Sequence, residues 1–562
     1  MKQLKRVLRY TKPYRKALAF SLAAASLYGV VSAVPTYVLK HTIDEIFIKR
    51  YSYLIVPFIL IFIAVFVFKG IFQYISSYSM HWVNNRVIND IRNDLFAKTI
   101  NFPLSFFQEN STGQLMSRFL NDVQMIQLAA ASAIRDGIRS FFEATFLVCF
   151  AIFQNKSLGI LMIIIGPIIG YTIKKLGKAR KNASVSIQTQ LGYISSMLQE
   201  TFVGVREIKA FNAETVEQSR FRDLLSRCFS FIMINVHIEC FLPALVEAIA
   251  VSGCGIIFYV AAHQVLDGTI TAGQLTSFVA AVILAYQPLK KIINVYSEVQ
   301  YGLAAAERIF AVIDTVYPAT QNRVHELAHF NHSIVFNNVS FSYIDKINVL
   351  SSVNLTIQKG ESVGIIGPSG SGKSTLCDLL LGFVTPTAGS ILIDQVDIAK
   401  ISLSSLRNNI GYVGQRTFLF NDSIMRNVAY ARPKASTDDV IKACKIAHAD
   451  EFIQTMPDGY NTIVGENGTL LSGGQKQRLT IARALLKDPE IFIFDEATSA
   501  LDEDSEHMIR LAIDEIRGKK TLIIVSHRPT MLQNVDRVLL INRHTIQDVA
   551  RDQVFRQLNL NS

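Results

Sequence analysis

The stretch that decides the fold of the second half of this chain is Gly367-Pro368-Ser369-Gly370-Ser371-Gly372-Lys373-Ser374. It has the pattern Gly-x4-Gly-Lys-Ser and lies between a strand-like run, Ser362–Ile366, and a helical one, Thr375–Leu381, as a phosphate-binding P-loop requires. Glycines let the backbone curl so that its N–H groups point at a β-phosphate, Lys373 reaches the β- and γ-oxygens, and Ser374 can ligate Mg²⁺. The stretch predicts a nucleoside triphosphate site.

Two carboxylates follow a second apolar run in the same half. Ile491-Phe492-Ile493-Phe494 predict a buried strand, which ends in Asp495 and Glu496. Such a strand can also end in solvated acids, but with a P-loop upstream the pair indicates a metal and water site. We expect Asp495 to hold Mg²⁺ through water, and Glu496 to orient the attacking water or accept its proton.

A third motif distinguishes among P-loop proteins, which include kinases, GTPases and motors. Leu471-Ser472-Gly473-Gly474-Gln475 precedes a helical stretch and resembles the signature of the ATP-binding cassette family. The other motifs of that family appear along the chain in the family's order. Tyr343 resembles the aromatic residue that stacks on adenine, Gln415 the Q-loop glutamine, Ser499-Ala500-Leu501-Asp502 the D-loop and His527 the switch histidine. Each single residue could be structural, so the order of the motifs carries the resemblance.

The resemblance implies ATP and Mg²⁺ as cofactors, with Glu496, His527 and Gln415 as catalytic residues. The residues implied to bind ATP are Tyr343, Gly367, Pro368, Ser369, Gly370, Ser371, Gly372, Lys373, Ser374, Thr375, Ser472, Gly473, Gly474, Gln475 and Asp502. The implied metal ligands are Ser374, Gln415 and Asp495.

The first half of the chain is apolar. Of the 562 residues 50% are apolar and 18% charged, and the mean hydropathy of +0.28 excludes a disulfide scaffold or a disordered chain. Six apolar stretches are about long enough for helices that cross roughly 30 Å of hydrocarbon. They lie near 17–39, 53–75, 137–153, 157–173, 240–262 and 275–293. The first resembles a signal peptide in its basic flank, but its length and the five later stretches favour a retained helix.

The net charge of +11 comes from this apolar half. The stretches 76–136 and 174–239 carry 5 and 10 Lys or Arg residues, whereas the three segments on the other side of the predicted spans carry only Lys40, Lys49, Arg50 and Lys156. Basic residues beside apolar spans are typical of cytoplasmic loops, so this pattern favours a chain with both termini in the cytoplasm. It also explains the basic charge more simply than nucleic-acid binding does.

The two basic stretches lack Pro and Gly clusters and show helical apolar spacing, so we expect long helical extensions into the cytoplasm. Tyr317-Pro318-Ala319-Thr320 begins a polar linker, and short β-rich runs alternate with helical ones from Ser333 onward. The predicted fold is an α-helical six-span transmembrane domain over 1–314 with long cytoplasmic extensions, a linker over 315–332, and an α/β P-loop cassette over 333–562.

The resemblance to ABC exporters extends over the whole chain. Phe106-Phe107, residues 113–118 and Asp122-Val123 look like the first coupling region, and residues 200–211 look like the stretch before the second. Six spans fused ahead of one cassette is the half-transporter arrangement. The chain looks most like the bacterial lipid A flippase group at Trp82-Val83, Ser105-Phe106-Phe107, Pro288-Leu289-Lys290 and residues 304–314, and multidrug half-transporters share much of this pattern.

Two places depart from the flippase pattern. Gln287 stands where that group has a basic residue, although Arg135 matches another of its basic positions. Residues 541–546 lack the usual Gly-Lys turn, which leaves the last 20 residues without an assigned place.

The resemblance also implies a dimer, because in the family ATP lies between the P-loop of one cassette and the signature of the other. Since Glu496, His527 and the signature are intact, a homodimer is a more economical interpretation than a heterodimer. The implied activity is ATP hydrolysis coupled to export or flipping of an amphipathic lipid-like substrate by alternating access. The expected location is the bacterial inner membrane, with the cassette in the cytoplasm.

Charged residues in the apolar stretches bear on the cargo, since such residues usually face a cavity. They are Lys69, Glu143, Glu239 and Glu247, of which Lys69 and Glu239 could instead be interfacial. Arg135, Arg139 and Lys290 at the cytoplasmic mouth of a cavity would suit a phosphorylated glycolipid. The alternatives are a multidrug or peptide exporter with the same ATPase mechanism and, in another class, a ligand-gated channel.

Overall fold

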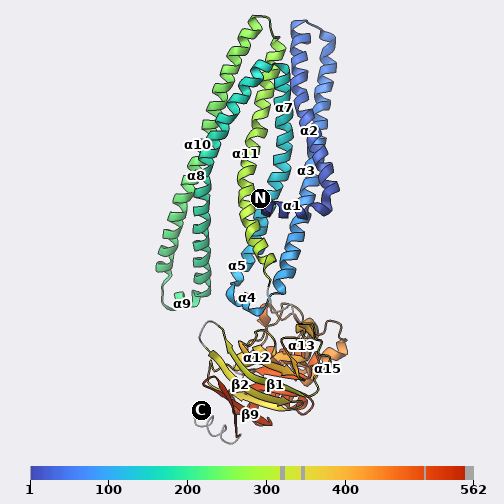
Figure 1. Ribbon diagram of the computed structural model, residues 1–562, viewed down its shortest axis with the longest axis vertical. Helices are drawn as coiled ribbons and strands as arrows, with labels where there is room; N and C mark the ends of the chain where they lie inside the picture. The colour runs from blue at the N-terminus through green and yellow to red at the C-terminus, as the bar shows by residue number, and fades with distance from the viewer. Residues whose placement is uncertain (1, 317–322, 344–347, 499–501, 551–562) are drawn as a thin grey trace. The chain divides into compact units, whose positions relative to one another are not determined.

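The computed structural model describes residues 2–316, 323–343, 348–498 and 502–550. The chain divides into two compact units (Figure 1). One comprises Met1–Asn101 and Ser111–Thr315, and the other comprises Phe102–Asn110 and Val316–Ser562. Helix α4 (Leu104–Glu109), from the predicted first coupling region, therefore belongs to the second unit.

The first unit is built of long helices that run along one another, with the short basic helix α1 lying across them (Figure 1). Helix α2 packs against α3 and α7, α11 packs against α6 and α7, and α8 pairs with α10. The helices are α1 (Lys2–Tyr10), α2 (Arg15–His41), α3 (Ile55–Ile100), α5 (Thr112–Ser117), α6 (Val123–Ala131), α7 (Ile138–Gln154), α8 (Lys156–Val203), α9 (Val205–Ala210), α10 (Glu214–Leu266) and α11 (Ala272–Asp314).

Four helical segments of the described chain are long and apolar enough to cross a membrane. They are Lys12–Ile48, Ser52–Ile100, Glu214–Leu266 and Ala272–Ile292. The predicted stretches 137–153 and 157–173 fall in α7 and α8, and the count of six spans stays a prediction. Helices α3 and α8 continue unbroken past their apolar parts, and α10 begins well before its own, because no Pro or Gly cluster interrupts the polar residues there.

Helices α5, α6 and α7 are joined by two wider π-helical turns, Arg118–Asp122 and Ser132–Gly137. In the first turn the buried carboxylate of Asp122 accepts hydrogen bonds from the guanidinium of Arg308 on α11. In one of them Nε of Arg308 donates to Oδ2 of Asp122 over 3.0 Å. The two turns thus place charged side chains at helix contacts where an apolar residue would otherwise pack, as π-helical turns often do near functional sites.

The second unit contains two sheets (Figure 1). The antiparallel sheet has the order β2-β1-β4-β5, and the other has the order β10-β9-β3-β8-β7-β6, parallel except for β10. The strands are β1 (Ser333–Ser342), β2 (Asn348–Gln358), β3 (Ser362–Ile366), β4 (Ala388–Ile393), β5 (Val396–Asp397), β6 (Ile410–Val413), β7 (Ile491–Asp495), β8 (Thr521–Val525), β9 (Arg537–Asn542) and β10 (Thr545–Val549).

The helices of this unit pack around the parallel strands, whose three central members β3, β7 and β8 are buried along their whole length. Such strands present their carboxyl ends at one edge of the sheet, which is where ligands bind in open α/β sheets. The helices are α12 (Lys373–Leu380), α13 (Leu403–Asn408), α14 (Ile424–Ala429), α15 (Thr437–Ile446), α16 (Asp450–Gln454), α17 (Gly473–Leu486) and α18 (Glu503–Ile516).

Two regions of the cassette differ from a simple interpretation of the sequence. Within the expected linker, Leu327 and Phe330 are buried in the core around the antiparallel sheet, and the backbone N–H of His325 donates to Lys400. Farther on, β9 and β10 form a hairpin although the usual glycine is missing, because Arg543 and His544 adopt φ values of 44° and 69°. The atypical residues 541–549 therefore complete the sheet.

Candidate functional site

The P-loop leaves β3 and enters α12, as its sequence predicts. Gly370 and Gly372 adopt φ values of 76° and 104°, which side chains with a Cβ rarely adopt. The hydroxyl of Ser371 is buried and has no hydrogen-bond partner among the described residues. Because a buried polar atom without a partner is costly, this donor fits a phosphate oxygen that would satisfy it.

Lys373 is 5% exposed and points back into the loop. Its Nζ donates hydrogen bonds of 2.9 Å to the carbonyl oxygens of Gly367 and Pro368 and lies 3.9 Å from Oε1 of Glu496. Burial lowers the pKa of the Lys373 ammonium, while the charges of Glu496 and Asp495 oppose that shift. The lysine is thus held in the loop by backbone carbonyls.

The expected metal ligands Ser374 and Asp495 lie together, with Ser374 Oγ donating to Oδ1 of Asp495 over 3.2 Å. Burial and the charge of Asp495 raise the pKa of Asp378, on α12, to about 6. They also raise the pKa of Tyr412, on β6, above its ordinary value. These shifts indicate a negative, oxygen-rich end of β7, and a hydroxyl beside a carboxylate is a donor set that Mg²⁺ accepts.

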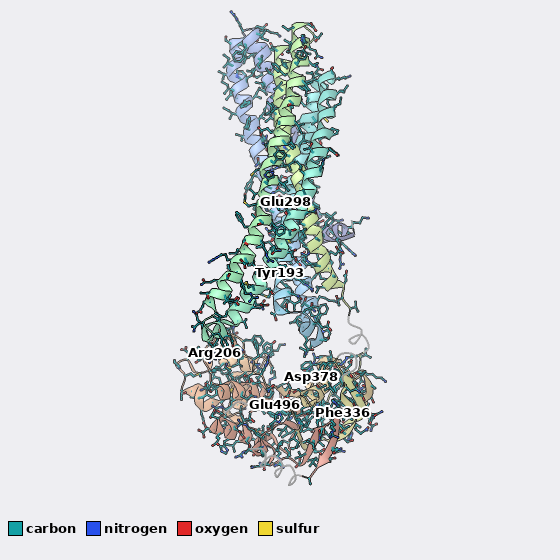
Figure 2. All side chains as sticks on the ribbon, turned by 90° about the vertical axis from the view of Figure 1, so that its left-hand side faces the viewer. Tyr193, Arg206, Glu298, Phe336, Asp378 and Glu496 are labelled. Atoms are coloured by element: carbon teal, nitrogen blue, oxygen red, sulfur yellow. The ribbon has the colours of Figure 1, made fainter. Side chains whose placement is uncertain are left out.

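The three expected catalytic residues meet at one carboxylate. Oε1 of Glu496 lies 2.8 Å from Nε2 of His527, and Oε2 accepts a 2.8 Å hydrogen bond from Nε2 of Gln415. Glu496 follows β7 with a φ of 52°, in the left-handed region, which a residue with a Cβ adopts at a cost. Gln415 was also expected to ligate the metal with Asp495. Among the described residues its side chain hydrogen bonds to Glu496 and not to Asp495. Figure 2 labels Glu496 and Asp378 within the cassette.

Tyr343, the expected adenine-stacking residue, is 48% exposed. Its hydroxyl lies 3.2 Å from Oγ1 of Thr375, and its ring meets Phe341 edge-on with the ring centroids 4.8 Å apart. The stacking role stays a prediction. Of the expected D-loop, Ser499-Ala500-Leu501 lies outside the described residues, whereas the Asp502 side chain caps α18 by accepting a 3.1 Å hydrogen bond from the Ser505 N–H.

The signature motif begins α17. Ser472 caps the helix reciprocally with Gln475: the Gln475 N–H donates to Ser472 Oγ over 3.3 Å, and the Ser472 N–H donates to Gln475 Oε1 over 2.9 Å. A Cβ on Gly474 would lie 2.1 Å from Oγ of Ser505, so only glycine permits this approach of α17 to α18. The motif thus presents a capped helix N-terminus, where backbone N–H groups favour an anion.

In the helical unit, four of the charged residues expected near a cargo site form one network between α2, α3 and α7. Nζ of Lys69 lies 3.6 Å from Glu143 and 5.2 Å from the centre of the Tyr28 ring. Arg139 is 9% exposed and lies 3.7 Å from Asp136, which also accepts a 3.0 Å hydrogen bond from Arg135.

The remaining expected cargo residues lie outside this network. Lys290 lies 6.0 Å from the centre of the Tyr286 ring, and Gln287, Glu239 and Glu247 are exposed. Three further members of the network were not predicted from the sequence. Tyr28 contacts Glu143, Ser77 contacts Arg139, and His81 contacts Arg135. The packing of α2 against α3 and α7, and of α3 against the turn Ser132–Gly137, brings them there.

Comparison with known proteins matches both units to described families. A model of the ABC transporter transmembrane region matches residues 18–289, and a model of the ABC transporter matches residues 350–499. The chain is 36% identical over 545 residues to a protein of Desulfotalea psychrophila named ATP-dependent lipid A-core flippase, which covers 97% of this chain and 95% of that protein. Proteins of the same name from Syntrophus aciditrophicus and Haemophilus influenzae are 35% and 32% identical, covering 98% and 100% of this chain and 91% and 96% of theirs.

Proposed function

This chain belongs to the ABC transporter family, and from that premise we propose that it flips an amphipathic lipid-like substrate across a membrane with the energy of ATP hydrolysis. Relatives along the whole chain that are named lipid A-core flippases support this proposal. The transport unit is a six-span domain over 1–314, joined by a linker to a cassette whose core includes Leu327 and Phe330 ahead of the predicted start at 333. The protein is integral to the membrane, with the cytoplasmic face of the bacterial inner membrane as the proposed place of the cassette.

The observation that carries the substrate class is the buried cation Arg139 in the network between α2, α3 and α7. Three cations, Lys69, Arg135 and Arg139, face three carboxylates: Glu143 and Asp136 form ion pairs with them, and the charge of Glu298 acts on Arg135. Nε of Arg139 is buried without a hydrogen-bond partner among the described residues. A buried cationic donor without a partner is costly in an apolar bundle, and an anionic head group would reduce that cost.

For hydrolysis, this chain's residues have separate tasks. Lys373 exchanges its bonds with Gly367 and Pro368 for phosphate oxygens, and Ser374 with Asp495 would hold Mg²⁺, which supplies positive charge to the phosphates when bound. Glu496 accepts a proton from the attacking water or orients it. Gln415 and His527, each 2.8 Å from a different oxygen of Glu496, fix the direction of that carboxylate.

The complete site is a dimer in this proposal. The signature residues Ser472, Gly473 and Gly474 act on ATP held by the P-loop of the partner, and the intact Glu496, His527 and signature favour two identical chains. Closure of the cassettes on ATP turns the cavity outward, and hydrolysis resets it.

The test is ATPase stimulation of the chain in nanodiscs by three ligands: a lipid A-type glycolipid, a neutral glycolipid and a cationic drug. The proposal expects the phosphorylated lipid to stimulate most. Stimulation by the cationic drug alone would leave a multidrug exporter. Gln287, where the flippase group has a basic residue, argues for a weaker preference for phosphorylated lipids or for a different head group. Ion conductance without ATP turnover would point to a channel.

A further inference from the structure

The turn that carries His527 is tied to helix α18 by one buried carboxylate. Glu506, in the first turn of α18, is 8% exposed. One of its oxygens accepts a hydrogen bond within an ion pair from Nη1 of Arg528, and the other accepts a hydrogen bond from Oγ1 of Thr530. Because Arg528 directly follows His527, Glu506 holds the chain immediately after the proposed switch residue.

The same end of α18 touches the signature. Ser505 is buried, and a Cβ on Gly474 would collide with its side chain, so α17 and α18 approach each other as closely as glycine permits. Ser505 and Glu506 are adjacent in the first turns of α18. One run of contacts therefore joins Gly474 of the signature to His527.

We propose that Glu506 is a positioning residue that transmits the state of the signature to the hydrolytic centre of the same chain. This inference rests on the proposed function, in which the signature of one chain contacts the ATP of its partner, whereas His527 acts beside the ATP of its own chain. Glu506 then couples the two ATP sites of the dimer. Closure at the signature sets the place of His527, whose Nε2 is 2.8 Å from Glu496.

A purely structural role predicts something different. Glu506→Gln keeps the volume of the side chain and an acceptor for Thr530, but it removes the ion pair with Arg528. If Glu506 only supports the fold, ATP affinity and thermal stability fall together with turnover. If it positions His527, turnover and the cooperativity of ATP hydrolysis fall while ATP affinity stays.

The experiment compares full-length wild type, Glu506→Gln, Arg528→Gln and the double variant in nanodiscs. Glu503→Gln is the matched control, because Glu503 is an exposed acid in the first turn of the same helix. For Glu506→Gln we expect kcat to fall about tenfold or more, since small misplacements of catalytic groups cost that much. The Kd for ATP should stay within about twofold, and the Hill coefficient for ATP should fall to about 1. The double variant should be no slower than the slower single variant, because both remove the same link.

Wild-type kcat and cooperativity in Glu506→Gln would overturn the inference and leave the proposed function intact. A wild-type Hill coefficient of 1 in an active dimer would also overturn it. Absence of ATPase activity in the wild type would instead overturn the proposed function. If Glu506→Gln fails to fold, Thr530→Val removes one of the two hydrogen bonds with little change of shape. It should lower the Hill coefficient at unchanged ATP affinity, and an unchanged coefficient would count against the inference.

Discussion

The Nζ atom of Lys373 lies 2.9 Å from the carbonyl oxygen of Gly367, the first residue of its own P-loop. The ammonium is therefore already hydrogen bonded, and a nucleotide gains from it only the difference between phosphate oxygens and these carbonyls. That difference is favourable because hydrogen bonds to a charged partner are stronger than those to a neutral one.

Replacing Lys373 by Ala should weaken ATP binding by about 10- to 100-fold, since a charge-assisted hydrogen bond contributes about 1.5–3 kcal/mol. Binding of a fluorescent ATP analogue to the purified chain measures this. Lys400→Ala, which removes an exposed lysine of the same unit, is the control and should bind like the wild type. Equal affinity in all three proteins would remove Lys373 from the site.

Glu496→Gln should hydrolyse ATP about 10²- to 10⁴-fold more slowly with ATP binding nearly unchanged, because a general base is lost but the phosphate loop is not. Steady-state hydrolysis and analogue binding on the same preparation separate the two effects. The variant should accumulate as an ATP-bound closed dimer. Hydrolysis at the wild-type rate would show that Glu496 is not the base.

Mixed dimers test whether each site is shared by two chains. A Lys373→Ala chain paired with a Ser472→Arg chain has one intact composite site and one doubly broken site, so partial activity should survive if one site turns over alone. Each mutant homodimer should be inactive. An inactive mixed dimer, alongside half-active dimers with a single mutant chain, would favour sites confined within one chain.

Arg135→Gln should lower the affinity of a phosphorylated glycolipid by about fivefold, since one basic residue near an anionic head group contributes about 1 kcal/mol. The concentration of lipid that half-stimulates the ATPase reports this, and the effect should shrink at high salt. Arg86→Gln is the control, because Arg86 contacts Trp82 on α3 outside the charged network. The same loss with a neutral glycolipid would contradict an electrostatic role for Arg135.

Phe330→Ala should destabilise the cassette by about 3–5 kcal/mol, because the ring is fully buried and its removal leaves a cavity. For a domain of this size we expect the melting temperature of the cassette transition to fall by roughly 6–20 °C. His329→Ala, at the exposed neighbouring position, should melt like the wild type. If Phe330→Ala melts at the wild-type temperature, Leu327 and Phe330 belong to a linker and not to the core of the cassette.

That the residues proposed to bind nucleotide lie close together can be predicted from the sequence, since they follow buried strands directly. Asp495 ends β7 and the P-loop follows β3, so parallel pairing brings both to the same sheet edge. The contacts between Glu496, Gln415 and His527 follow from the same rule. Their distances do not, because the φ of 52° at Glu496 has no signature in the residues around it.

The charged network of the helical unit could not be predicted in the same way. Lys69 and Glu143 lie 74 positions apart, and their meeting depends on how α3 and α7 are rotated about their axes. Leu327 and Phe330 were missed for a different reason. They stand in a short and mostly polar stretch in which Val324 is exposed, and only the position of the antiparallel sheet shows that they are buried.

The π-helical turn at Ser132–Gly137 has a consequence for how the chain can gain or lose residues. Such a turn holds one residue more than the α-helical turn it replaces. The helices before and after it keep the directions of their side chains around the helix axis. Deleting one residue here should therefore convert the turn to ordinary helix and leave the packed faces of α6 and α7 where they are, whereas a deletion within α7 would rotate every later side chain by about 100°. The turn contains Arg135 and Asp136. A chain shortened here would therefore keep the packing of its helices, but these two charged side chains would no longer lie at their present positions.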